Sequence, residues 1–129
     1  MERLGIFNRV IREYGPFVYD SIVELNYYID VSSIDEVSIL DIKFVIQAET
    51  YEQLEMQMRF KNVSQYTLRK VSGIIGLTRD LIVVDNKDKG WTNEMRYYVH
   101  DDSGYGEGDG FGVIEFYCQS IEVISIKPV

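Results

Sequence analysis

The residues best suited to chemistry lie between 100 and 110, where the chain reads His-Asp-Asp-Ser-Gly-Tyr-Gly-Glu-Gly-Asp-Gly. Carboxylates at this density suggest a cation site, and glycines suggest a loop that cradles phosphate. The glycines fall on every second position from 104 to 112, which is not the Gly-x-Gly-x-x-Gly spacing of a dinucleotide-binding loop, and no Gly-Lys-Ser/Thr follows. The carboxylates would also repel a phosphate group, so a phosphate site is excluded.

A calcium site of the EF-hand type is excluded by spacing. That loop needs its oxygen ligands and its glycine at fixed positions, and a start at Asp101 or Asp102 does not reproduce them. A weak cation site of another geometry stays open, formed by Asp101, Asp102, Glu107 and Asp109. We expect no metal ion as a resident group and no cofactor.

Two interpretations of this stretch remain. Glycines accept any turn geometry and carboxylates keep a loop hydrated, which is typical of a solvated hairpin connection. The alternative is an acidic loop that binds a partner. From Tyr97 to Ile126 the chain carries acidic residues and neither lysine nor arginine. Such an asymmetry of charge would steer a basic protein toward this part of the molecule.

Nucleophilic catalysis would have to use the single histidine, His100, and the single cysteine, Cys118. If strands at 95–100 and 113–118 are hairpin neighbours, His100 lies opposite about Val113. At about 3.3 Å per residue, that places it on the order of 16 Å from Cys118, so the two cannot form a catalytic pair. We expect Cys118 in the core and His100 in solvent at a strand end.

Acid–base chemistry would need a carboxylate pair such as Asp101 with Glu115, one of them buried with a raised pKa. Nothing in the sequence marks either residue in this way. Metal catalysis lacks a cluster of ligand residues. We therefore expect that the chain is not an enzyme.

Aromatic side chains offer a second kind of binding surface. Binding of single-stranded nucleic acid needs lysine and arginine beside the rings, and a formal charge of −8 opposes it. Sugars need no such charge, so a small-ligand or carbohydrate-binding β domain is the alternative to a protein binder. Aromatic residues also anchor protein interfaces. The rings considered are Tyr27, Tyr28, Trp91, Tyr97, Tyr98, Phe116 and Tyr117.

Length and composition define the scaffold that must position these groups. At 129 residues and 46% hydrophobic, the chain is expected to form one domain, 1–129, with a real core. Its acidic balance disfavours nucleic acid and anionic membranes. The N-terminus lacks the apolar run of a signal peptide, and no stretch reaches the roughly 18 apolar residues of a membrane span. We expect a soluble protein of the cytoplasm.

Hydrophobic periodicity predicts one helix followed by strands. Leu4, Phe7, Val10, Ile11 and Tyr14 have helical spacing, and Gly15-Pro16 should end the helix. From residue 17 onward the period is two. The sets expected to share a strand face are Val23, Leu25, Tyr27 and Ile29; Leu40, Ile42, Phe44, Ile46 and Ala48; and Leu54, Met56, Met58 and Phe60.

The later part of the chain is less regular. Asn62 or Ser64 would suit the start of a short helical turn. Strands are expected at 81–85, 95–100 and 113–126, and the apolar parity of the last changes after Cys118, which predicts a β-bulge near Gln119-Ser120. The fold class expected is therefore α+β. An N-terminal helix packs on a mostly antiparallel, twisted sheet or partial barrel of about six to seven strands.

Short motifs between residues 58 and 126 carry a resemblance. They are Phe60-Lys61-Asn62-Val63-Ser64, Gly90-Trp91, Arg96-Tyr97-Tyr98-Val99-His100-Asp101, Ile114-Glu115-Phe116-Tyr117-Cys118 and Ile121-Glu122-Val123. In this order they resemble small bacterial proteins that are encoded beside polymorphic secreted toxins and are regarded as their immunity proteins. The resemblance implies a non-enzymatic protein that binds and neutralises a toxin.

The charge asymmetry, rather than the resemblance, assigns the expected contacts. Asp101, Asp102, Glu107 and Asp109 would steer a basic toxin domain, and Tyr105 and Trp91 would anchor it. An exposed edge strand would also allow two copies of the chain to pair across a two-fold axis as a homodimer.

Overall fold

The computed structural model describes residues 5–31, 36–49, 52–68, 75–76, 81–86, 96–101 and 114–129. Its helical elements are η1 (Gly5–Phe7) and α1 (Asn8–Tyr14). The strands are β1 (Phe17–Asp30), β2 (Val37–Ala48), β3 (Gln53–Lys61), β4 (Ser64–Leu68), β5 (Ile75–Gly76), β6 (Leu81–Asp85), β7 (Tyr97–Asp101), β8 (Ile114–Cys118) and β9 (Ser120–Pro128).

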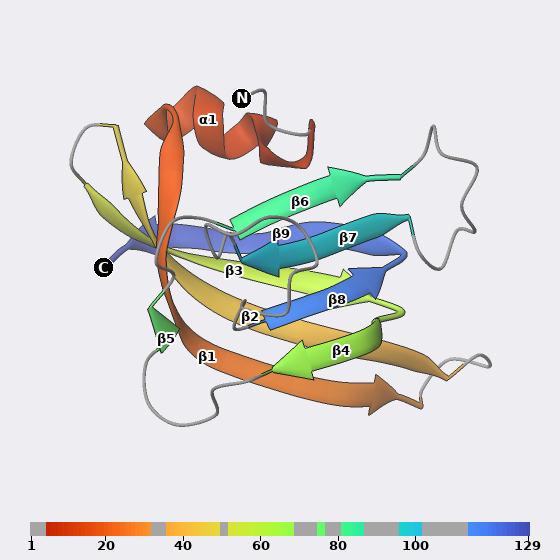
Figure 1. Cartoon of the computed structure of the whole chain (residues 1–129). Helices are drawn as coiled ribbons and strands as arrows, with labels where there is room; N and C mark the ends of the chain where they lie inside the picture. The colour runs from red at the N-terminus through yellow and green to blue at the C-terminus, as the bar shows by residue number, and fades with distance from the viewer. Residues whose placement is uncertain are drawn as a thin grey trace.

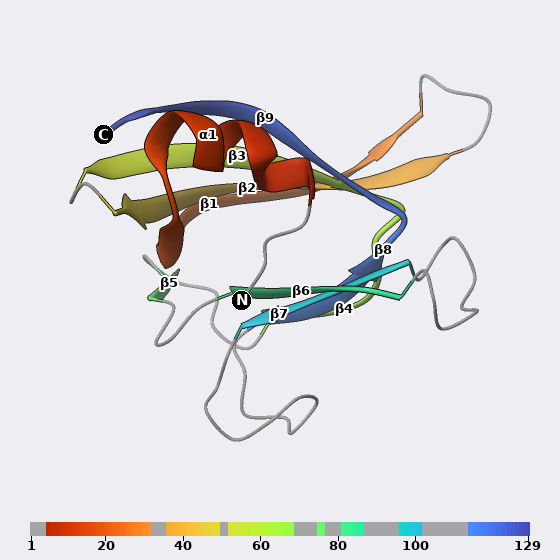
Figure 2. The same ribbon diagram turned by 90° about the horizontal axis from the view of Figure 1, so that it is seen from above.

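The strands form two antiparallel sheets that face each other (Figures 1 and 2). One has the order β5-β1-β2-β3-β9 and the other β4-β8-β7-β6. The expected antiparallel pairing and short N-terminal helix are confirmed. The expected twisted sheet or partial barrel is matched only in part: the strands form two sheets and not a closed barrel, and the described residues hold nine strands rather than six or seven. We call the side of each sheet that faces the other its inner face.

The strand count was too low for two reasons: β4 and β5 lie where no strand was expected, and the strand expected at 113–126 changes sheets along its length. β8 pairs with β7 in the four-stranded sheet, and β9 pairs with β3 in the five-stranded sheet. Between them lies a bend at Gln119. The change of apolar parity there is real, but its cause is this change of sheet and not a bulge within one strand.

A second corner faces the first. β3 leaves the five-stranded sheet and β4 joins the four-stranded one, with Asn62 between them at a φ of 55°. The Gln119 N–H donates to the Lys61 carbonyl at 2.9 Å, and the Asn62 amide donates to the Gln119 side chain. The helical turn expected at Asn62 or Ser64 is therefore wrong. Asparagine suits this corner because it tolerates the left-handed region better than most residues.

The core lies between the two inner faces. Every residue of the sets expected on β2 and β3 is buried, from Leu40 to Ala48 and from Leu54 to Phe60, which confirms both alternations. Across the interior, the Phe60 ring meets Phe116 edge-on with centroids 4.9 Å apart. Such a contact joins the sheets through apolar burial and favourable ring geometry.

The N-terminal helix lies across the top of the sandwich in Figure 1. Phe7 and Val10 are buried, and the Phe7 ring packs against Phe17 with centroids 5.7 Å apart. Gly15, at a φ of 80°, donates its N–H to the Ile11 carbonyl and ends the helix as expected. Among the described residues, no helix is long and apolar enough to cross a membrane.

Candidate functional site

One of the residues assigned to partner binding is described: Asp101, the last residue of β7. The others lie outside the described residues: Trp91, Asp102, Tyr105, Glu107 and Asp109. The structure does describe the residues at which the segments 87–95 and 102–113 leave and rejoin the fold. We call these two places the tryptophan root and the acidic root.

The acidic root is joined by a hydrogen bond on the inner side of the sheet. Asp101 is 7% exposed, and its Oδ1 accepts the Ile114 N–H at 3.0 Å. Segment 102–113 therefore starts and ends at two residues that are bonded to each other. A carboxylate buried to this degree presents little charge to a partner, so Asp101 acts here as a structural residue. Its expected steering role stays a prediction.

The outer side of the acidic root is held by a stack of rings. Tyr98 lies directly opposite Tyr117, with ring centroids 4.8 Å apart, and it also stacks on His100 at 4.7 Å. The Tyr98 hydroxyl donates to Glu115 Oε2 at 2.7 Å. Cross-strand ring and hydrogen-bond pairs of this kind stabilise a hairpin. Both faces of the β7–β8 hairpin are thus held just before segment 102–113 begins.

The tryptophan root lies at the other end of β7. The Asn86 N–H donates to the Arg96 carbonyl at 2.6 Å, and Arg96 pairs with Asp85 at 3.4 Å. Arg96 of one root is five residues from Asp101 of the other, which is about 16 Å along the strand at roughly 3.3 Å per residue.

His100 and Cys118 do not form a catalytic pair, as expected, although the details differ. His100 lies opposite Glu115 rather than Val113, and Tyr97 lies opposite Cys118. His100 is 8% exposed, so the solvent position expected for it is wrong; its ring is covered by stacking on Tyr98. Cys118 is fully buried in the core, as expected, and burial raises the pKa of its thiol to about 12.

The carboxylates of Asp101 and Glu115 are not a pair. Glu115 is opposite His100, so both project from the outer face of the sheet. Asp101 is the next residue after His100, and side chains alternate along a strand, so its carboxylate lies on the inner side. The acid–base arrangement considered for these two residues is therefore absent.

The candidate aromatic residues do not form one platform. Tyr97 and Phe116 are in the core, whereas Tyr98 and Tyr117 stack on the opposite face of the same sheet. Tyr27 and Tyr28 belong to β1 in the other sheet. A hollow near the start of β1 is lined by none of these rings; it is bordered by Pro16, Phe17, Val18, Gln47, Ala48 and Glu49.

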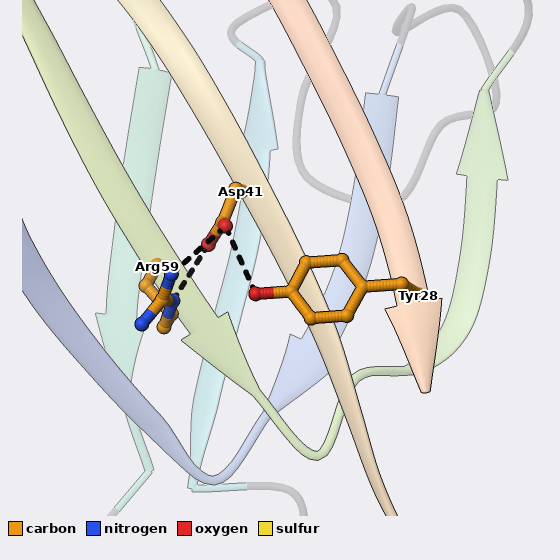
Figure 3. Close-up of polar contacts among 3 residues, drawn as sticks. All are labelled: Tyr28, Asp41 and Arg59. Carbon is orange, nitrogen blue, oxygen red and sulfur yellow. Dashed lines mark hydrogen bonds and ion pairs between the residues drawn. The ribbon is translucent and has the colours of Figure 1, made fainter. Parts of the chain in front are cut away.

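A polar cluster on the outer face of the five-stranded sheet was not singled out from the sequence. Arg59 donates to Asp41 twice, through Nε at 2.9 Å and an Nη at 3.1 Å, and the Tyr28 hydroxyl donates to Asp41 at 3.1 Å (Figure 3). Asp41 raises the pKa of Arg59, and desolvation together with Asp41 raises the pKa of Tyr28. In the sequence, this contact is indicated only by opposite charges at outward positions of β2 and β3. The pairing of Asp41 with Arg59 depends on the strand register, which the sequence does not give.

Neighbouring charges on this outer face are also paired. The Lys43 Nζ lies 2.9 Å from Glu24 and 3.5 Å from Glu55, and Lys127 approaches Glu55 at 3.6 Å. Exposed pairs of this kind contribute little to stability. They do compensate charge locally, so the face around Lys43 is a mixed polar surface and not a concentrated acidic one.

β1 is partly exposed in a way that the sequence did not predict. Val23, Tyr27 and Ile29, expected on a dry face, are 39%, 49% and 46% exposed. β1 and β2 continue to pair as far as Asp30 and Val37, whereas β3 leaves β2 at Ile39. The tip of this hairpin therefore extends past β3, as Figure 2 shows, and Tyr27 still contacts the Tyr66 ring of β4 with centroids 6.0 Å apart.

No family model, curated protein or solved structure matches this chain. Within the part of the chain that the structure describes, no group of three or more His, Cys, Asp or Glu side chains is arranged to hold a metal ion. The weak cation site considered at Asp101, Asp102, Glu107 and Asp109 falls largely outside that part.

Proposed function

We propose that this protein is a non-enzymatic bacterial immunity protein that neutralises a basic toxin in the cytoplasm by covering its working surface. One observation carries the proposal: the acidic root is fixed on both faces, by the Asp101–Ile114 hydrogen bond on one side and the Tyr98–Glu115 bond on the other. A rigid scaffold that presents a connecting segment is a common arrangement for binding. It also lowers the ordering cost of association.

The charge of the chain supports the kind of partner. The formal net charge is −8, and segment 102–113 contributes acidic residues without any lysine or arginine. In this proposal Asp102, Glu107 and Asp109 steer the partner, and Tyr105 anchors it. Complementary charge accelerates encounter and disfavours other acidic proteins.

Trp91 serves in this proposal as a second anchor. Its segment is mounted at the tryptophan root, at the opposite end of β7. In this proposal a partner that uses both anchors has its working surface covered. Occlusion of this kind needs a stable scaffold and a complementary surface, and it needs no catalytic group.

The test is capture of a partner by the immobilised chain from a lysate of the native cell, at low salt and again at about 0.5 M salt, where the screening length falls to a few ångströms. The proposal expects one basic protein whose capture weakens at high salt. That protein, expressed alone, should be toxic to cells and harmless when co-expressed with this chain. Absence of a protein partner at both salt concentrations would contradict the proposal and favour a small-ligand or carbohydrate-binding domain.

A further inference from the structure

A hollow lies on the five-stranded sheet where β1 begins and β2 ends, just after the chain leaves α1 (Figure 1). Its volume is about 330 Å³, at the lower end of the range for small-ligand sites. All of its lining residues belong to the described part of the chain. They are Pro16, Phe17, Val18, Gln47, Ala48 and Glu49. The hollow is therefore formed by two short stretches of chain, 16–18 and 47–49.

Strand register places this hollow on the outer face of the sheet. Phe17 lies opposite Ala48, and both residues are 3% exposed, so their side chains point into the core. Val18 lies opposite Gln47. Because side chains alternate along a strand, the side chains of this second pair project outward and flank the hollow. Its floor is the main chain of the first pair.

The two sides of the hollow differ in chemistry. β1 contributes apolar surface, since Val18 is 50% exposed and Pro16 precedes the strand at an exposed position. β2 and the residue after it contribute polar groups, the Gln47 amide and the Glu49 carboxylate. The Gln47 Nε2 donates to the Ala48 carbonyl at 3.5 Å, so Oε1 is the atom of this amide that can accept a bond from a ligand. An occupant meets an apolar wall on one side and oxygen acceptors on the other.

The Glu49 carboxylate has no cation partner among the described residues. Glu55 of β3, by contrast, lies 3.5 Å from the Lys43 Nζ. The chain beside the Glu49 carboxylate is Gly15, where an added Cβ would lie 3.3 Å from Oε2. This neighbour supplies no donor, because the Gly15 N–H donates to a carbonyl of α1 and the next residue, Pro16, has no N–H. The carboxylate is therefore held at the rim of the hollow with its acceptor oxygens available.

We propose that this hollow binds a small organic cation, a primary ammonium group on a compact apolar body. The ammonium group donates to the Glu49 carboxylate and to Gln47 Oε1, and the body covers Val18 and Pro16. Such an occupant buries apolar surface and supplies the carboxylate with charged donors. The net charge of −8 favours a cation over an anion. The inference goes beyond the proposed function, because it assigns a ligand site on the five-stranded sheet, whereas the acidic root belongs to the four-stranded one.

Cyclohexylammonium is the probe, because it is charged at neutral pH and its ring is apolar and compact. The control molecules are cyclohexanol, which lacks the charge, cyclohexanecarboxylate, which reverses it, and methylammonium, which lacks the ring. Binding to the full chain is followed by ¹H–¹⁵N NMR at low salt. The backbone amides of Val18, Ala48 and Glu49 and the side-chain amide of Gln47 should shift with the probe. The dissociation constant should be about 1–10 mM, as expected for a molecule this small in an open site, and none of the controls should saturate these shifts.

Two matched pairs of variants locate the site. Glu49→Gln removes the carboxylate charge, and Glu52→Gln removes the same charge at an exposed residue outside the lining. The first should weaken probe binding by about tenfold, because it removes a charge-assisted bond, and the second by less than about twofold, through long-range charge alone. Val18→Thr replaces a methyl group of the apolar wall with a hydroxyl and should weaken binding by about two- to threefold. Val129→Thr, at a residue that is 73% exposed and outside the lining, should leave binding unchanged.

Several outcomes would overturn the assignment: shifts scattered over the acidic surface, equal binding of methylammonium, or equal binding by the unmodified chain and Glu49→Gln. Tighter binding of Nα-acetyl-lysine amide than of cyclohexylammonium would assign the hollow to a lysine side chain of a protein instead. Partner capture separates this inference from the proposed function. Glu49→Gln should capture the partner as well as the unmodified chain does, and loss of capture with this variant would contradict a separate ligand site. If no partner is captured but the probe binds as described, the proposed function is wrong and the ligand site stands.

Discussion

Asp101 and Ile114 are 13 residues apart in the chain, and the side chain of the first accepts the backbone N–H of the second at 3.0 Å. The residues between them, 102–113, are the glycine-rich acidic segment. Asp101, which was expected to attract a partner, also closes the base of the segment. Its neighbours at 102, 107 and 109 are left to carry the proposed electrostatic role.

Removal of this carboxylate should destabilise the fold. Asp101→Ala leaves the buried Ile114 N–H without this acceptor, and an unsatisfied buried group costs about 1–3 kcal/mol. Urea denaturation of the purified protein measures the change. Asp20→Ala, at an exposed residue of β1, is the control and should stay within about 0.5 kcal/mol of the unmodified chain. Equal stability of the two variants would show that the bond does not hold the root.

The Arg59–Asp41 contact should depend on the shape of the guanidinium group. Arg59→Lys keeps the charge but loses the two parallel hydrogen bonds, because an ammonium group cannot form the planar fork. We expect a loss of about 0.5–1.5 kcal/mol in the free energy of unfolding. The opposite exchange at an exposed site, Lys127→Arg, should change stability by less than about 0.5 kcal/mol. An unchanged midpoint for Arg59→Lys in urea would contradict the role of the bidentate pair.

The corner at Asn62 should discriminate between glycine and alanine. Both substitutions remove the bond to the Gln119 side chain, but only alanine is strained at a φ of 55°. Asn62→Ala should therefore be less stable than Asn62→Gly by about 1 kcal/mol, the lower end of the cost of a left-handed conformation. Thermal or urea unfolding of the two variants side by side gives the difference. If alanine is as stable as glycine, the backbone at this corner is not strained.

Burial of Cys118 predicts a specific loss of stability in alkali. Its thiol pKa is raised from 9.0 to about 12 in the folded chain. Below pH 9 the Cys118 thiol is protonated in both the folded and the unfolded chain, so its ionisation does not lower the free energy of unfolding. As pH rises toward 12, the unfolded thiol ionises first, so stability falls by about 1.4 kcal/mol at pH 10.

The tyrosines titrate in the same range, so this loss is measured as a difference from Cys118→Ala. The difference in unfolding free energy between the two proteins should shrink from pH 8 to pH 10. A constant difference would mean that the thiol ionises equally in both states.

The sequence predicted β2 and β3 well because their alternation is strict and their inner positions, such as Phe44 and Met56, are all large and apolar. It could not distinguish a bulge from a change of sheet at Gln119, since either one reverses the parity of the residues that follow. The set expected to share a face of β1 was correct except for Val23, which lies within the register shifts before Glu24. The exposure of the tip was not predicted, because it follows from the extension of β1 and β2 past β3.

The candidate site was only partly accessible from sequence. The scarcity of catalytic groups and the core position of Cys118 could be read from composition and hydropathy. The burial of His100 could not, because the sequence does not show that its ring stacks on Tyr98 of the same strand. The cluster of Tyr28, Asp41 and Arg59 likewise arises from register, which periodicity alone does not fix.

The central claim is that the acidic segment steers a basic partner, and the most direct measurement is the association rate with the captured protein as a function of salt. The test variant is Asp102→Asn/Glu107→Gln/Asp109→Asn. The control is Glu13→Gln/Glu49→Gln/Glu52→Gln, which removes the same charge at three exposed residues elsewhere. We predict that the test variant associates at least about tenfold more slowly at low salt and loses most of its salt dependence, while the control keeps both. Equal rates and equal salt dependence for the two variants would contradict the account.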